Sequence, residues 1–302
     1  MRSRASALAV LIAVPLVLAA CGEKKDAAPT GATTSESTPA TTTEATTTQP
    51  QATTVEVTPP PAGSNGAKAV KAYKAYLVAQ SAVLMKQITV FTTALREGDP
   101  ETAVKTYGKA RAAYESLQRV AARLGLDPAM NAQEGTVPAS EWSGFHMIEK
   151  TIFDTGTTGG TEEPAARLMT DATAVRDSVK ELQLDPELIL RDMQDLLARI
   201  ADTTVEPSEE PYSLANLYAM SGDLRSAEAA WRALRPLVAA NDRSLAAELD
   251  GAFQTAVVTI ESNRVPGRGF RSYDELGDLE RTAIVNAVNV ARESLASADI
   301  SE

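Results

Sequence analysis

The chain has 302 residues, a formal net charge of −11, one cysteine and one histidine. A single cysteine excludes an intrachain disulfide framework and a cysteine-rich zinc site. The acidic balance argues against a protein that binds nucleic acid or anionic lipid headgroups.

The first residues predict a secretory signal. Arg2 and Arg4 precede an uncharged apolar run that ends at Ala20, and this run of about 16 residues is shorter than a membrane span. The letters LAAC that end at Cys21 resemble a bacterial lipobox, whose cysteine is lipidated and becomes the mature N-terminus. We therefore expect removal of residues 1–20, lipidation of Cys21, and an exported protein anchored to the outer face of the cell membrane. The alternative is a free thiol.

A tether follows the lipidated cysteine and completes the segment 21–66. From Gly22 to Gly66 the chain is built largely of Thr, Ala, Pro, Glu and Gly, with no apolar period that could form a core. Such a stretch spans about 35–40 Å as a flexible coil. It would let a folded domain work away from the membrane.

The folded body is expected over 67–302, and its first two helices have clear boundaries. Gly98 is a C-terminal cap, Asp99 the next N-cap and Pro100 the first residue of the second helix, which we expect to run to Leu124. The short link predicts antiparallel neighbours. The stripe of the first helix consists of Val70, Tyr73, Leu77, Leu84, Ile88, Phe91 and Leu95.

Further breaks divide the rest of the chain. We expect a third helix capped by Ser140, a fourth that ends near Gln183, and a fifth that opens at Asp185-Pro186. Breaks follow at 205–213, at Gly222-Asp223, at Asn241-Asp242 and at the letters RVPGRGFRSYD. These signals predict an all-α protein of eight or nine helices and no convincing strand. Two packed bundles, 67–185 and 186–302, would meet near 185–210.

The third helix carries the only histidine, in the letters SGFHMIEKTIF. His146 and Glu149 are three positions apart and share one helix face. Imidazole and carboxylate are common metal ligands. The alternative is an ordinary hydrogen-bonded pair, since a glutamate follows any histidine at this spacing about once in fifteen times by chance.

Nothing in the sequence points to an enzyme. No nucleophile–base arrangement is visible, and the single histidine would have to serve as both base and ligand. The acidic pairs Glu162-Glu163 and Glu209-Glu210 fall at helix starts or breaks, where capping explains them. The two tryptophans fall at helical positions, which favours packing over a sugar platform.

The segments AVKAYKAYLVAQSAVL, FTTALREGDPETAVKTYGKARAAYESLQRVA, GFHMIEKTIF, YSLANLYA, LRPLV and FRSYDEL resemble, in order, the imelysin-like domain of EfeO/EfeM lipoproteins. The resemblance covers about residues 67–298, and its most specific element is Gly144-x-His146-x-x-Glu149. It implies an exported component of the EfeUOB iron-uptake system that works with an iron permease. Some members carry an N-terminal cupredoxin domain, and here the tether stands in its place.

The resemblance also implies a metal site, for iron or another divalent or trivalent ion, at His146, Glu149 and Glu115. The chain departs from the family pattern at further positions. Three amides, Gln80, Gln118 and Asn131, stand where the family has acids, so only weaker oxygen donors remain. The segment YSLANLYA lacks the histidine and both aspartates of the family motif.

Two functional hypotheses follow. The chain is a cell-surface lipoprotein that binds iron and passes it to a membrane permease. Alternatively, it is a degenerate member whose metal site is lost and whose helical body is a non-catalytic binding or scaffolding module. No nucleic-acid partner is expected. The three amides discriminate between the two hypotheses, because restoring Gln80, Gln118 and Asn131 to acids should strengthen metal binding if the geometry of the site persists.

Overall fold

The computed structural model describes residues 57–205 and 209–302. The expected signal, lipidation site and most of the tether lie outside the described residues. No helix in the described part is both long and apolar enough to cross a membrane. The α-helices are α1 (Asn65–Glu97), α2 (Pro100–Glu115), α3 (Gln118–Arg123), α4 (Asp127–Asn131), α5 (Gly144–Asp154), α6 (Glu162–Ser178), α7 (Pro186–Val205), α8 (Asn216–Asn241), α9 (Arg243–Glu261) and α10 (Asp278–Leu295).

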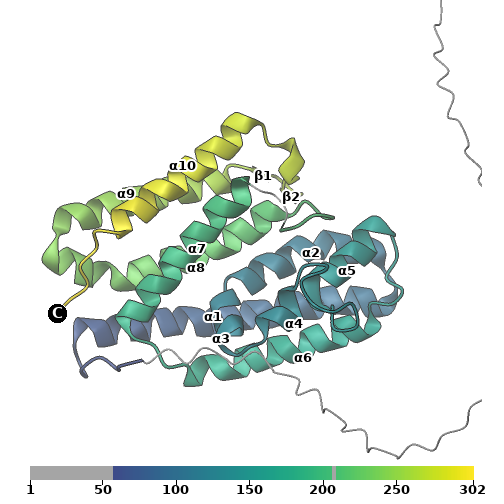
Figure 1. Cartoon of the computed structure of the whole chain (residues 1–302), viewed down its shortest axis with the longest axis horizontal. Helices are drawn as coiled ribbons and strands as arrows, with labels where there is room; N and C mark the ends of the chain where they lie inside the picture. The colour runs from purple at the N-terminus through teal and green to yellow at the C-terminus, as the bar shows by residue number, and fades with distance from the viewer. Residues whose placement is uncertain (1–56, 206–208) are drawn as a thin grey trace, which may run out of the picture. The chain divides into compact units, whose positions relative to one another are not determined.

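The all-α prediction is confirmed, and the helices form two packed bundles (Figure 1). In the first bundle α1 packs against α2 and α6, and α5 packs against α2 and α6. In the second, α7 packs against α8 and α10, and α9 packs against α8 and α10. Helix α8 also packs against α1 and α2, which joins the bundles. One continuous hydrophobic cluster runs through both.

The boundaries of α1 and α2 follow the expected signals. Gly98 has a φ of 72°, in the left-handed region, and caps the end of α1. The side chain of Asp99 accepts a hydrogen bond from the amide of Thr102, and Pro100 is the first residue of α2. Tyr73 and Leu84, from the predicted stripe, are buried in the core. Helix α1 begins at Asn65, two residues before the expected start of the folded body.

The prediction that the second helix continues to Leu124 is wrong. Helix α2 ends at Glu115, and the separate short helix α3 follows. The hydroxyl of Ser116 donates to the carbonyl of Ala112 and to that of Gly222 on α8. A serine that bonds the carbonyl four residues back favours bending of a helix, and the bond to Gly222 ties the end of α2 to α8.

The expected break at Gly222-Asp223 is also wrong, because α8 runs through it without interruption. A Cβ at position 222 would lie 2.4 Å from the carbonyl oxygen of Ala112 and 2.7 Å from the Cβ of Glu115. This glycine therefore serves close packing of α8 against α2 rather than a turn.

Two smaller corrections concern the motif helix and the region after α9. Helix α5 begins at Gly144 with Ser143 as its N-cap, so Ser140 is not the cap. The letters RVPGRGF form a short antiparallel hairpin, β1 (Arg264–Val265) and β2 (Gly269–Phe270). Single turns of 3₁₀ helix, η1 (Val179–Glu181) and η2 (Tyr273–Glu275), complete the described elements.

Candidate metal centre

The first residue of the motif, Gly144, lets α5 start against α4. Its φ is 79°, and a Cβ there would lie 2.3 Å from the carbonyl oxygen of Met130. Any other residue would clash with backbone and be strained. The glycine thus fixes where the next two turns of α5 place their side chains.

His146 and Glu149 lie together in the interior. Both residues are fully buried, and Nδ1 of His146 lies 3.0 Å from Oε2 of Glu149. The amide nitrogen of Gln133 lies 3.1 Å from Nε2 of His146 and donates to the carbonyl of Glu209 at 2.8 Å. Because this amide nitrogen can only donate, Nε2 accepts, and Nδ1 carries the proton that bonds Glu149.

Backbone amides hold the second oxygen of Glu149. Its Oε1 accepts hydrogen bonds from the amides of Ser213 at 2.8 Å and Tyr212 at 3.3 Å. Burial raises the pKa of Glu149, but the bonds from His146 and Ser213 outweigh it and hold the pKa below its usual value. Glu149 is therefore a fixed carboxylate at neutral pH.

Glu210 completes the cluster, and it was not predicted. It is fully buried, its Oε2 accepts from the hydroxyl of Tyr107 at 2.7 Å, and its Oε1 accepts from Nε of Arg111 at 2.5 Å. Burial raises the pKa of Glu210 to about 7 although Arg111 lowers it. The interpretation that helix capping explains Glu209-Glu210 is wrong for Glu210, whose carboxylate accepts from Tyr107 and Arg111.

These three residues fit a metal ion by their donors. One ring nitrogen of His146 and one carboxylate oxygen each from Glu149 and Glu210 all lie within 4.8 Å of one another. An imidazole and two carboxylates suit iron, zinc or manganese. The ring of His146 would release its Nδ1 proton, or use Nε2 in place of its bond with Gln133, to coordinate the ion.

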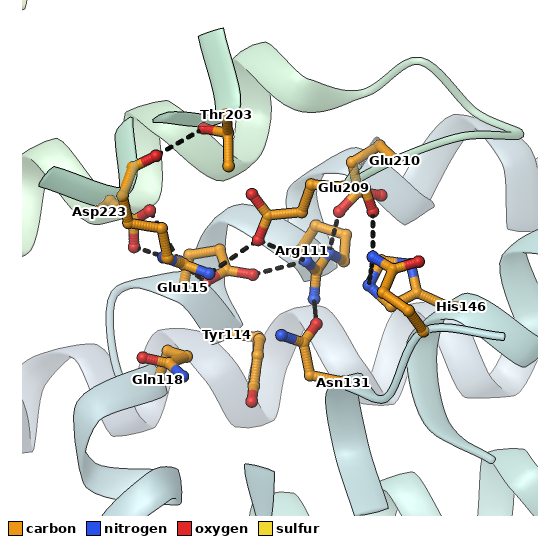
Figure 2. A network of polar contacts seen from close by, with 12 residues as sticks. Arg111, Tyr114, Glu115, Gln118, Asn131, His146, Thr203, Glu209, Glu210 and Asp223 are labelled. Atoms are coloured by element: carbon orange, nitrogen blue, oxygen red, sulfur yellow. Dashed lines mark hydrogen bonds and ion pairs between the residues drawn. The ribbon is translucent and has the colours of Figure 1, made fainter. Parts of the chain in front are cut away.

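An arginine lies at the edge of this cluster and bears on its charge (Figure 2). Arg111 is fully buried; its Nη2 lies 2.6 Å from Oε1 of Glu115, and its Nη1 donates to Oδ1 of Asn131 at 2.7 Å. Arg111 therefore stands between Glu115 and Glu210. A metal ion at Glu210 would share that carboxylate with a guanidinium.

Glu115 belongs to a second polar group, around Arg199 of α7. Nη2 of Arg199 contacts Glu115 and donates to both oxygens of Asp223, at 2.6 and 2.7 Å, while Nη1 donates to Glu209 at 2.7 Å. Burial raises the pKa of Glu115, but Arg111 and Arg199 outweigh it and keep the carboxyl ionised. The structure thus pairs Glu115 with two arginines rather than with His146.

The three amides that the resemblance implied as weaker ligands lie apart from the cluster of His146, Glu149 and Glu210. Asn131 bonds Arg111, and Gln118 donates to Asp127 at 2.9 Å. Gln80 lines a hollow between α1, α2 and α8 that includes none of the three cluster residues. Sequence reasoning missed Glu210 and Gln133. Both lie in loops, where no helical spacing relates them to His146 and Glu149.

The comparisons with known proteins agree with this fold. The imelysin family model matches residues 69–298, so the chain belongs to the imelysin family. It is 28% identical over 233 residues to the iron uptake system component EfeM of Pseudomonas syringae pv. syringae (strain B728a), covering 76% of this chain and 82% of that protein. It is equally similar to the iron uptake system component EfeO of Escherichia coli (strain K12), of which the match covers only 62%. The resemblance to the EfeO/EfeM proteins is confirmed.

Proposed function

We propose that the chain binds a metal ion, iron in its physiological role, at His146, Glu149 and Glu210. The observation that carries this proposal is the buried cluster of one imidazole and two carboxylates whose ligand atoms lie within 4.8 Å. Two buried carboxylates without a cation between them would repel each other, and a bound metal ion relieves that repulsion. The iron is cargo, so no bond-making chemistry is required.

The relatives supply the setting for this proposal. EfeM and EfeO are named as iron uptake components, and a protein of this kind would capture iron outside the membrane and deliver it to a permease. In the same proposal residues 1–20 are removed, Cys21 is lipidated, and residues 22–66 tether the helical body to the membrane. The proposal includes no nucleic-acid partner.

Arg111 favours a second candidate function. Its guanidinium already supplies a positive charge 2.5 Å from Oε1 of Glu210, as a metal ion would. On this alternative the cluster is a hydrogen-bonded polar core, and the protein is a scaffolding or binding lipoprotein without metal. The two candidates differ in one measurable property, which is stoichiometric metal binding.

Metal binding by the full chain in mild detergent tests the proposal. We expect calorimetric titration with ferrous, ferric, zinc and manganese ions to show one strong site in the wild type. His146→Ala and Glu210→Gln each remove one ligand and should weaken binding by at least about tenfold.

Glu97→Gln is the matched control, because Glu97 is exposed at the end of α1 and far along the chain from the motif. It should bind as the wild type does. Absence of stoichiometric binding in the wild type would refute the metal proposal and favour the scaffold. Equal loss in Glu97→Gln would show that bulk negative charge, rather than the cluster, attracts the metal.

A further inference from the structure

A pocket of about 310 Å³ opens beside the metal cluster, between α2, the 213–215 loop and the β1–β2 hairpin. We call it the hairpin pocket. Its polar lining includes Lys105 and Tyr107 of α2, Ser213, and three residues of the hairpin region, Arg268, Arg271 and Glu275.

The pocket shares two residues with the walls of the metal cluster. Tyr107 lines the pocket and donates its hydroxyl to Glu210 at 2.7 Å. Ser213 lines it too and donates its backbone amide to Glu149 at 2.8 Å. Next to Ser213, Leu214 has a φ of 55°, a strained conformation for a residue with a branched side chain. The surrounding structure sustains this strain in a loop that borders the pocket through Ser213 and Leu214 and the cluster through the amide of Ser213.

One of the three cationic side chains that line the pocket has no ion-pair partner among the described residues. Lys105, Arg268 and Arg271 outnumber the one lining acid, Glu275, in a chain whose net charge is −11. Lys105 is paired with Glu101 and Arg271 with Glu280. Among the described residues the exposed side chain of Arg268 has neither an ion pair nor a hydrogen bond, so its guanidinium faces solvent at the pocket.

From this arrangement we propose that the hairpin pocket binds a small polycarboxylate anion, the chelator with which the metal ion arrives. The proposal rests on metal binding at the adjacent cluster. Arg268 holds one carboxylate by a charge-assisted hydrogen bond, as guanidinium groups do. The metal passes to Glu210 and Glu149 across the wall formed by Tyr107 and Ser213. The guanidinium of Arg268 attracts an anionic chelate to the pocket, whereas it gives no such attraction to a bare cation.

Citrate titrated into the metal-free full chain tests the pocket alone. We expect wild-type binding to weaken about tenfold in Arg268→Gln, which loses one charge-assisted bond. Glu275→Gln should bind citrate more tightly, because it removes the negative charge of the lining. Arg268 is exposed in the turn of the hairpin, so the variant should fold normally.

Arg243→Gln is the matched control. Arg243 is an exposed arginine at the start of α9, outside the pocket, and its loss changes the net charge by the same amount. Citrate binding that is equally weak in Arg243→Gln and Arg268→Gln, or absent from the wild type, would overturn the pocket proposal.

A second arm separates this proposal from the metal site. Ferric ion supplied as citrate complex should load Arg268→Gln about tenfold more slowly than the wild type. Metal supplied without chelator should bind both proteins equally, and His146→Ala should bind citrate like the wild type. If Arg268→Gln loses affinity for bare metal as much as it loses uptake of the citrate complex, Arg268 does not act through a chelator. That result would overturn the chelator pocket but not the metal site.

Discussion

At the scale of single residues, Glu210 shows most clearly where sequence reasoning ends. Its partners are Tyr107 and Arg111 on α2, about a hundred positions away in the chain. His146 and Glu149 were visible as a pair because three positions make one helix face. No local pattern connects Glu210 to them, since only the packing of the 209–215 loop against α2 and α5 brings it to the cluster.

The raised pKa of Glu210 leads to a prediction about how the stability of the protein depends on pH. Its pKa is about 7 in the folded protein and near 4.5 when unfolded, so the folded state binds this proton more tightly. The associated stabilisation is present below pH 4.5 and lost as the pH rises through 7. Relative to wild type, metal-free Glu210→Gln should therefore gain of order 3 kcal/mol across this range.

Chemical denaturation of both proteins at a series of pH values measures this gain. The altered bonds to Tyr107 and Arg111 add a difference in the free energy of unfolding that does not vary with pH. The prediction concerns only how the difference between the two proteins changes with pH. A difference between Glu210→Gln and wild type that stays flat with pH would mean that Arg111 keeps Glu210 ionised.

At the scale of elements, helix ends were predictable and helix interiors were less so. Gly98, Asp99 and Pro100 act locally, so their roles can be read without the fold. Gly222 looked like another such signal, yet it lies inside α8 because α2 approaches there. The hairpin β1–β2 was missed because strands of two residues are too short to show alternation.

The two roles of glycine predict opposite effects of alanine. Gly222→Ala should lower the free energy of unfolding by about 1–3 kcal/mol, because the new methyl group overlaps the backbone of α2. Gly251→Ala, in α9, meets no atom within 4 Å and should raise the free energy by about 0.5–1 kcal/mol. Thermal or denaturant unfolding of the two variants checks the signs. A stabilised Gly222→Ala protein would mean that α8 is not held so close to α2.

At the scale of the whole molecule, buried charge links the two bundles. Arg199 on α7 meets Glu115 of α2 and Asp223 of α8, while Arg111 of α2 reaches Glu210 in the loop before α8. The two bundles and their hydrophobic stripes could be predicted from periodicity. Their polar junction could not, because ion pairs between distant helices leave no periodic trace.

Removing one partner of this junction should be costly. Arg199→Met leaves Asp223 and Glu115 less compensated in the interior and should lower the free energy of unfolding by about 3–5 kcal/mol. Arg191→Met, on the same helix but half exposed and 3.8 Å from Glu187, should change it by less than about 0.5 kcal/mol.

The double variant Arg199→Met/Asp223→Asn distinguishes charge from packing. It should recover part of the loss, because the buried negative charge disappears along with its partner. Denaturant unfolding of the wild type, both single variants and the double variant completes the cycle. Strictly additive losses would show that Arg199 and Asp223 are energetically independent despite their contact.

Helix α8 also carries a constraint on how such sequences can diverge. A Cβ on Gly108 would lie only 2.6 Å from the ring of Tyr218. A Cβ on Gly269 would lie only 1.8 Å from the hydroxyl oxygen of the same tyrosine. The same hydroxyl accepts a hydrogen bond from the amide of Phe270. One tyrosine thus forbids side chains at two positions more than a hundred residues apart. A smaller residue at 218 would therefore make room for a side chain at position 108 and would release the hairpin that borders the pocket. Gly269 would remain restricted to glycine by its φ of 94°.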